Sequence, residues 1–179
     1  DHNVGRILAA LEAAGLSERT RIIYTSDHGE MLGQHGLWWK STMYDDAVGV
    51  PLIVAGPDLP EGRVVSHVVS LVDCFPTILE AVGARPCPED VDLPGSSLWP
   101  VARGEAVGER VVFSEYHAAG SPTGVFMVRD GRYKYVHYVG LPPQLFDLRE
   151  DPDEFHDLAG DPRYADVLRE RERTLRRLV

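Results

Sequence analysis

The sequence is poor in cysteine, in positive charge and in long apolar runs. Its 179 residues include 2 cysteines, too few for a disulfide framework, and 18 Lys and Arg against 28 Asp and Glu. The net charge of −10 works against sequence-independent nucleic acid binding, which requires a basic face. The apolar runs are too short to cross a bilayer. We therefore expect a soluble globular protein with no nucleic acid partner and no membrane anchor, while its compartment, cytoplasmic or periplasmic and secreted, stays open.

Glycines, prolines and short β-branched runs divide the first hundred residues into elements. Helical spacing of apolar residues predicts a helix over "DHNVGRILAALEAAGL", with Gly15 as its stop. The runs "RIIYT" and "VPLIVAG" predict strands, the first of them buried. A second, short helix is predicted over "VDCFPTILEAVGA", with Asp73 as N-cap and Gly83 at its end. Its apolar stripe consists of Ile78, Leu79 and Val82. Helices between strands indicate an α/β layer with a parallel or mixed sheet.

The second half of the chain predicts an antiparallel sheet and a helix. After a connector rich in Pro and Gly come four β-type runs, "RVVFSEYH", "GVFMVRDG", "RYKYVHYV" and "PQLFDL". Asp130 and Gly131 form a hairpin turn between the second and third runs. Asp147, Asp151 and Asp153 are interpreted as turn and cap residues. The end, "DPRYADVLRERERTLRRLV", predicts an amphipathic helix on the sheet, with arginines suited to its C-terminal dipole.

The motif SDHG follows the first predicted strand. It places the carboxylate of Asp27 and the imidazole of His28 at the carboxyl end of a strand, where open α/β folds build their sites. Both side chains can bind one divalent cation if the backbone turns sharply, and Gly29 permits such a turn. The alternative is that Asp27 caps the next helix and His28 is a hydrogen-bonded turn residue. Asp45 and Asp46 are weaker candidates for completing a metal site.

The block "TRIIYTSDHGEMLGQHGLWWKSTMYDDAVGVPLIVAGP" resembles the corresponding block of the sulfatase family, in the alkaline phosphatase superfamily. In that family a strand ends in SDHG or SDNG, a lysine follows, and a VPLIV strand comes next. The segments "LVDCFPTILEAVG", "LPGSSLWPVARG" and "MVRDGRYKYVHYVGLPPQLFDLREDPDEFHDLAGDP" resemble later family segments in the same order. The resemblance implies an α/β fold: part of an alkaline-phosphatase-like α/β sandwich, followed by a small four-stranded antiparallel sheet with a C-terminal helix. Residues 1–105 would form the C-terminal part of the catalytic domain and residues 106–179 a small α+β subdomain.

The resemblance also implies roles for three residues. Asp27 and His28 match two metal ligands, usually for Ca²⁺ and in some members for Mn²⁺ or Mg²⁺. Lys40 matches the lysine that contacts the sulfate ester and steadies charge on its leaving oxygen. A cation and an ammonium would stabilise the charge that ester hydrolysis builds on oxygen atoms. The alternative for Lys40 is an exposed or snorkelling lysine.

We therefore expect a sulfuric ester hydrolase that acts on a small-molecule or sugar sulfate. One alternative is a phosphonate monoester or phosphodiester hydrolase of the same superfamily. Another is a non-catalytic fragment that keeps the fold.

The chain departs from the family pattern at the nucleophile. Members carry a Cys- or Ser-x-Pro-x-Arg motif near the amino end, and its first residue is oxidised to formylglycine. In "CFPTI" the position of the arginine is taken by Ile78, so we interpret Cys74 as a free core cysteine. The resemblance implies a C-terminal portion that is inactive alone, with the formylglycine and the remaining metal ligands on the N-terminal portion of the same enzyme. Whether the enzyme is a homo-oligomer stays open.

Other residues near the motif carry no role from the resemblance. His35 is interpreted as a surface or structural histidine. Trp38 and Trp39 either wall the pocket or fill core space. His117 and His137 could face the substrate, but neither matches a family position with a role.

Overall fold

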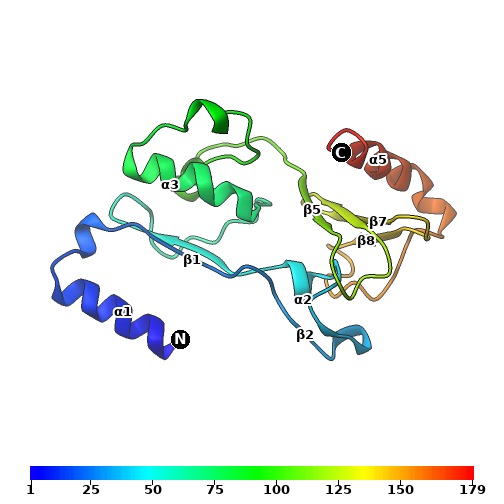
Figure 1. The fold of residues 1–179 in the computed structure, drawn as a ribbon, viewed down its shortest axis with the longest axis horizontal. Coiled ribbons are helices and arrows are strands. Elements are labelled where there is room, and N and C mark those ends of the chain that lie inside the picture. The colour runs from blue at the N-terminus through cyan, green and yellow to red at the C-terminus, as the bar shows by residue number, and fades with distance from the viewer. The chain divides into compact units, whose positions relative to one another are not determined.

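The computed structural model describes residues 1–179 and divides into two compact units (Figure 1). Unit 1 contains residues 1–25, 51–65 and 72–107, and unit 2 contains residues 26–50, 66–71 and 108–179. Each unit is therefore discontinuous in sequence. The segment that carries the SDHG motif belongs to the same unit as the C-terminal sheet.

Unit 1 contains the two strands predicted in the first half of the chain. Strand β1 (Ile22–Thr25) pairs with β4 (Leu52–Ala55), and the pair is antiparallel. The prediction of a parallel sheet is wrong for these strands, whereas the mixed alternative is compatible with them. The prediction that the first strand is buried is also wrong: Ile22 and Ile23 are half-buried, and Tyr24 is 43% exposed. A ribbon of two strands has too few neighbours to bury both of its faces.

The helices of unit 1 are α1 (His2–Ala13), α3 (Cys74–Val82) and α4 (Trp99–Arg103), with short 3₁₀ turns η1 (Ser17–Arg19), η3 (Leu71–Asp73) and η4 (Pro88–Asp90). Both predicted helices are confirmed. Gly15 follows the first with φ 66° and Gly83 ends the second with φ 67°, a left-handed conformation that glycine adopts readily. Asp73 occupies the N-cap position of α3, but its side chain does not cap the helix. It accepts a hydrogen bond from the Ser96 amide at 2.9 Å instead.

The interior of unit 1 is held by buried polar contacts around Thr77 on α3. The Thr77 hydroxyl donates to the carbonyl oxygen of Asp73 at 2.6 Å and accepts from the Leu98 amide at 2.8 Å. The indole of Trp99, which is 1% exposed, donates to the carbonyl oxygen of Thr77 at 2.8 Å. These bonds attach the connector before α4 to α3, because each satisfies a polar group that has no access to water.

The predicted apolar stripe of α3 is only partly buried within the chain. Leu79 is half-buried, whereas Ile78 is 51% and Val82 70% exposed. Cys74 is a free cysteine, as predicted, but it is half-buried rather than part of a closed core. The apolar spacing of the helix is therefore not matched by burial of Ile78 and Val82.

Unit 2 contains the predicted sheet, with strand order β5-β6-β7-β8 and antiparallel pairing throughout. The strands are β5 (Val112–Tyr116), β6 (Val125–Arg129), β7 (Tyr133–Tyr138) and β8 (Gln144–Asp147). The hairpin turn at Asp130 is confirmed, since its carboxylate accepts from the amides of Arg132 and Tyr133 at 2.7 Å each. Asp147 ends β8, is 2% exposed and pairs with Arg132.

The two faces of the sheet pack against different partners, because neighbouring residues of a strand point in opposite directions. Val128, Tyr135 and Leu145 face the predicted C-terminal helix, α5 (Ala165–Leu175), through Leu175. Figure 1 shows α5 beside the strands of this sheet. On the other face, Val125, Met127 and Val136 pack against Met43.

The segment 26–50 lies in unit 2 as a series of short elements. They are β2 (Met31–Leu32), η2 (Gln34–Gly36), β3 (Trp38–Trp39) and α2 (Asp45–Val48), with η5 (Pro162–Tyr164) preceding α5 further along the unit. Strands β2 and β3 form an antiparallel hairpin. Because Met43 is buried against the sheet, the segment that carries the motif is attached to the C-terminal subdomain.

Candidate functional site

The SDHG motif forms a tight turn that is closed by its own hydrogen bonds. The Ser26 hydroxyl donates to the carbonyl oxygen of His28 at 2.9 Å, and the His28 amide donates to Asp27 Oδ1 at 3.1 Å. The Gly29 amide donates to the carbonyl oxygen of Ala47 at 2.8 Å. A Cβ at Gly29 would lie 2.0 Å from the carbonyl oxygen of Asp46, so the turn approaches α2 as closely as only a glycine permits.

The imidazole of His28 is oriented with one nitrogen toward the other predicted site residues. Nδ1 lies 2.7 Å from the carbonyl oxygen of Gly29. A carbonyl oxygen can only accept, so Nδ1 carries a proton, and in the neutral ring Nε2 then keeps a lone pair. Asp27 Oδ2 lies 3.5 Å and Lys40 Nζ 2.5 Å from Nε2. The structure therefore brings Asp27, His28 and Lys40 together around one atom.

Asp27, His28 and Lys40 differ in charge, and the side chains of Asp27 and His28 differ in exposure. The Asp27 side chain is 86% exposed, and that of His28 is 36% exposed. A backbone hydrogen bond and the nearby His28 lower the pKa of Asp27, so its carboxylate is anionic at neutral pH. The site thus presents an oxygen anion, a nitrogen lone pair and an ammonium at the surface of unit 2.

Two of these groups have the chemistry of metal ligands. A carboxylate oxygen and a neutral imidazole nitrogen are ligands that divalent cations accept. The hydrogen bond from Nδ1 to a carbonyl oxygen orients the ring, as the corresponding bond does in metal-binding histidines. The chain contains no group of three or more His, Cys, Asp or Glu side chains that could hold a metal ion. Asp27 and His28 therefore fit a cation as a partial ligand set, which donors from outside the chain would have to complete.

Asp45 is not available as an additional ligand. Its carboxylate pairs with Lys134 and, at 2.7 Å, with Arg129. Sequence reasoning treated Asp45 and Asp46 as weak metal candidates and missed Lys134, because a lysine within a strand pattern is normally on the solvent side.

Lys40 follows a strained hairpin strand. Trp39 has a φ of 79°, a conformation in which bulky residues are outliers. Trp38 and Trp39 are 65% and 74% exposed, so neither fills core space within this chain. The alternative, that they wall a pocket, stays a prediction.

His35 has a packing role in unit 2. Its ring stacks on Tyr44 with centroids 3.9 Å apart and an interplanar angle of 9°, and lies 5.0 Å from the ring of Phe155. This arrangement agrees with the interpretation of His35 as a structural histidine.

The two histidines of the C-terminal sheet contact their own neighbours. His117 Nε2 lies 3.2 Å from Glu115 Oε2, and its ring meets Phe126 edge-on. His137 Nδ1 lies 3.5 Å from the hydroxyl of Tyr135. These contacts provide no evidence that either histidine faces a substrate.

Ser41 lies next to the site, and no motif in the sequence indicates it. Its hydroxyl lies 3.1 Å from that of Tyr116 and donates to the carbonyl oxygen of Ala119 at 3.3 Å. A Cβ at Gly120 would lie 2.8 Å from the Ser41 hydroxyl oxygen. The residue after Lys40 is thus held against the loop that joins β5 to β6.

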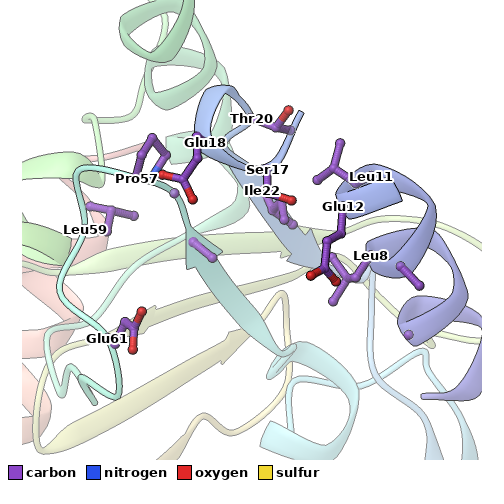
Figure 2. A pocket seen from close by; sticks show the side chains of 14 residues that line it. Leu8, Leu11, Glu12, Ser17, Glu18, Thr20, Ile22, Pro57, Leu59 and Glu61 are labelled. Carbon is purple, nitrogen blue, oxygen red and sulfur yellow. The ribbon is translucent and has the colours of Figure 1, made fainter. Parts of the chain in front are cut away.

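A separate hollow lies in unit 1, and Figure 2 shows its lining. The carboxylates of Glu12, Glu18 and Glu61 surround it, together with apolar side chains such as Leu8 and Leu59. It contains none of the three residues gathered around His28 Nε2. Three carboxylates would repel an anionic ester, so this hollow is not a candidate for the predicted reaction.

No helix of the structure has the length and apolar character needed to span a membrane.

Comparison with known proteins identifies related sequences. Residues 33–179 match the family model described as N-sulphoglucosamine sulphohydrolase, C-terminal. Arylsulfatase K of Xenopus laevis is 36% identical over 191 residues, a match that covers 100% of this chain and 35% of that protein. The chain thus spans about a third of the length of the curated relatives that it matches.

Two solved structures share the fold. BT4656, solved in complex with its substrate D-glucosamine-2-N,6-O-disulfate, has a TM-score of 0.90 and 29% identity, over 99% of this chain and 37% of that one. Phosphonate monoester hydrolase SpPMH from Silicibacter pomeroyi has a TM-score of 0.83 and 37% identity, over 97% of this chain and 37% of that one.

Proposed function

The chain belongs to the sulfatase family, and from this premise we propose that the complete protein hydrolyses a sulfate ester. Its fold is that of the C-terminal part of alkaline-phosphatase-like sulfatases, as the sequence predicted. The observation that carries the proposal is the convergence of Asp27, His28 and Lys40 on one point of unit 2. An anionic ester needs positive charge, which the Lys40 ammonium and a cation held by Asp27 and His28 would supply in a chain whose net charge is −10.

Each of the three residues has a part in this proposal. Asp27 and His28 would hold a divalent cation, most readily Ca²⁺ on the family resemblance, with Mn²⁺ and Mg²⁺ as alternatives. Such an ion would supply positive charge for the nonbridging sulfate oxygens. Lys40 would donate hydrogen bonds to the ester and stabilise the developing charge on its leaving oxygen. In the cation-bound enzyme the Lys40 ammonium would leave His28 Nε2, since cation and ammonium compete for one lone pair.

The nucleophile in this proposal is a formylglycine outside the 179 residues. Cys74 is a poor candidate, because burial raises the pKa of its thiol and Ile78 takes the place of the required arginine. The remaining length of the relatives, about two thirds, leaves room for the nucleophile and the missing metal ligands. We propose that this part of the protein also covers the exposed apolar side chains Ile78 and Val82.

The substrate is proposed as a class. The substrate of BT4656 is a sulfated amino sugar, and the relatives include arylsulfatases. We therefore propose a sugar or small-molecule sulfate ester. The likeness to SpPMH keeps a phosphonate monoester as the second candidate.

The proposal is tested by assaying the complete protein with an aryl sulfate and with the matching aryl phosphonate monoester. Faster sulfate hydrolysis is expected, and faster phosphonate hydrolysis would favour the second candidate. Asp27→Asn should reduce the metal content measured by elemental analysis, because an amide is a weaker cation ligand than a carboxylate. The control is Asp166→Asn, an exposed carboxylate on α5. Equal metal content in both variants would remove Asp27 from the ligand set.

A further inference from the structure

Lys134 on β7 is a charged side chain with 0% exposure in the middle of the C-terminal sheet. Its ammonium donates to the carbonyl oxygen of Met43 at 3.0 Å and to Asp45 Oδ1. Glu154 Oε1 lies 2.6 Å away, on a side chain that is itself only 2% exposed. Because burying charges is costly even when they are paired, this cluster is a poor way to gain stability alone.

The cluster holds the first residue of α2 from several sides. Glu154 Oε2 accepts a hydrogen bond from the Asp45 amide at 2.6 Å. Arg129 on β6 donates to Asp45 Oδ2 at 2.7 Å, while Lys134 binds the other carboxylate oxygen. Both the backbone and the side chain of Asp45 are thereby fixed to the sheet and to the loop that carries Glu154.

Helix α2 transmits this position to the SDHG turn. The helix has four residues, so the carbonyl groups of Asp46 and Ala47 lie within one turn of Asp45, and we expect them to shift with it. The carbonyl oxygen of Ala47 accepts from the Gly29 amide at 2.8 Å, and that of Asp46 occupies the space of a Cβ on Gly29. Gly29 in turn accepts the Nδ1 hydrogen bond of His28 that aims Nε2 at Lys40.

The residues next to Asp45 and Glu154 in the sequence also contact the loop before Lys40. Tyr44 precedes Asp45 and Phe155 follows Glu154, and both rings pack against His35. Glu154 has a φ of 58°, a backbone conformation that costs free energy for a non-glycine residue. The backbone is thus strained at Glu154, the residue whose carboxylate binds the first amide of α2.

We propose that Lys134, acting with Glu154 through Asp45 and α2, is a positioning residue that sets the Asp27–His28 turn relative to Lys40. This inference rests on the proposed function, since it assigns to the C-terminal sheet a part in building that site. The chain of contacts runs from the ammonium to Asp45, from α2 to Gly29, and from Gly29 to the His28 ring.

The test compares Lys134→Met with Leu175→Ala in the complete protein. Methionine keeps the length of the side chain but removes the charge. Leu175 is 5% exposed on the opposite face of the sheet, so its truncation lowers stability without touching the cluster. Binding of Ca²⁺ alone is measured by calorimetric titration of the metal-stripped protein, and hydrogen exchange is followed in peptides from residues 26–33.

We expect Lys134→Met to weaken Ca²⁺ binding about 10- to 100-fold, the range for outer contacts of metal ligands, and to accelerate exchange at the Gly29 amide. Leu175→Ala should change neither Ca²⁺ binding nor exchange at Gly29, even if it lowers the Tm as much as Lys134→Met or more. Equal Ca²⁺ binding and equal exchange in the two variants would overturn the proposal. If Lys134→Met does not fold, Asp45→Asn takes its place with the same expected results.

The assay also separates this inference from the proposed function. If Asp27→Asn leaves Ca²⁺ binding unchanged, the proposed metal site fails, and hydrogen exchange at Gly29 then decides the positioning role. Acceleration in Lys134→Met but not in Leu175→Ala supports the positioning role, and no acceleration contradicts it.

Discussion

At the scale of single residues, the site depends on which atoms of a short turn are left free. The hydrogen bond from His28 Nδ1 leaves the Nε2 lone pair facing Lys40, and it exists because Gly29 presents its carbonyl oxygen there. The sequence points to Asp27, His28 and Lys40 because a family block carries them, and their roles stay a prediction. It could not predict Lys134, since no local pattern distinguishes a buried lysine from an exposed one in a strand.

Gly29→Ala tests how closely the turn must approach α2. The added Cβ would lie 2.0 Å from the Asp46 carbonyl oxygen, so the backbone must shift. We expect a loss of roughly 1–3 kcal/mol or more in the free energy of unfolding, measured by denaturant titration of the complete protein. Gly131→Ala is the control, because a Cβ there has no atom within 4 Å. Similar unfolding free energies for the two variants would show that the turn can relax.

At the scale of elements, the alternation of apolar and polar residues and the turn residues were sufficient to predict an element whose faces are covered by other parts of this chain. The four-stranded sheet was predictable because both of its faces find partners, in α5 and in the segment around Met43. Strand β1 was predicted as buried and is not, because it pairs only with β4, and the exposure of Ile78 and Val82 on α3 is likewise not encoded in their apolar spacing. The position of residues 26–50 in unit 2 had no sequence signal, since it depends on long-range contacts such as that of Lys134 with Asp45.

The loop after β4 is attached to the rest of unit 1 by an ion pair with a defined pH dependence. Arg21 donates two hydrogen bonds to Asp58, at 2.8 and 3.1 Å, and a third to the carbonyl oxygen of Ala81 at 2.7 Å. The hydrogen bonds from Arg21 lower the pKa of Asp58 to about 2 against the opposing effect of desolvation, and Arg103 contributes further. The stabilisation is therefore present above the usual pKa of about 4 and is lost as the pH falls toward about 2.

Asp58→Asn should accordingly lower the Tm of the complete protein at neutral pH. The difference in Tm from the wild type should shrink as the pH falls from about 4 toward 2, because protonation of Asp58 removes the same ion pair. Thermal unfolding followed by circular dichroism at a series of pH values measures this difference. A difference that stays constant over this range would contradict the assigned role of the carboxylate.

At the scale of the whole molecule, the chain spans about a third of the length of its curated relatives, and we propose that it supplies part of a site. Two proposed ligands and a lysine lie in unit 2, with the C-terminal sheet behind them. The division proposed from the sequence, residues 1–105 and 106–179, stays a prediction about the domains of the complete enzyme. The nucleophile and the substrate selectivity are proposed to lie outside this chain, which we therefore expect to be inactive when produced alone.

The most direct measurement is the rate of aryl sulfate hydrolysis by the complete protein with Lys40→Ala. Loss of one charge-stabilising donor should lower kcat/KM by roughly two orders of magnitude or more. Arg169→Ala, an exposed cation on α5, is the control for the loss of one positive charge and should leave the rate unchanged. A rate for Lys40→Ala equal to that of the wild type would contradict the assignment of Lys40, Asp27 and His28 to one ester-binding site.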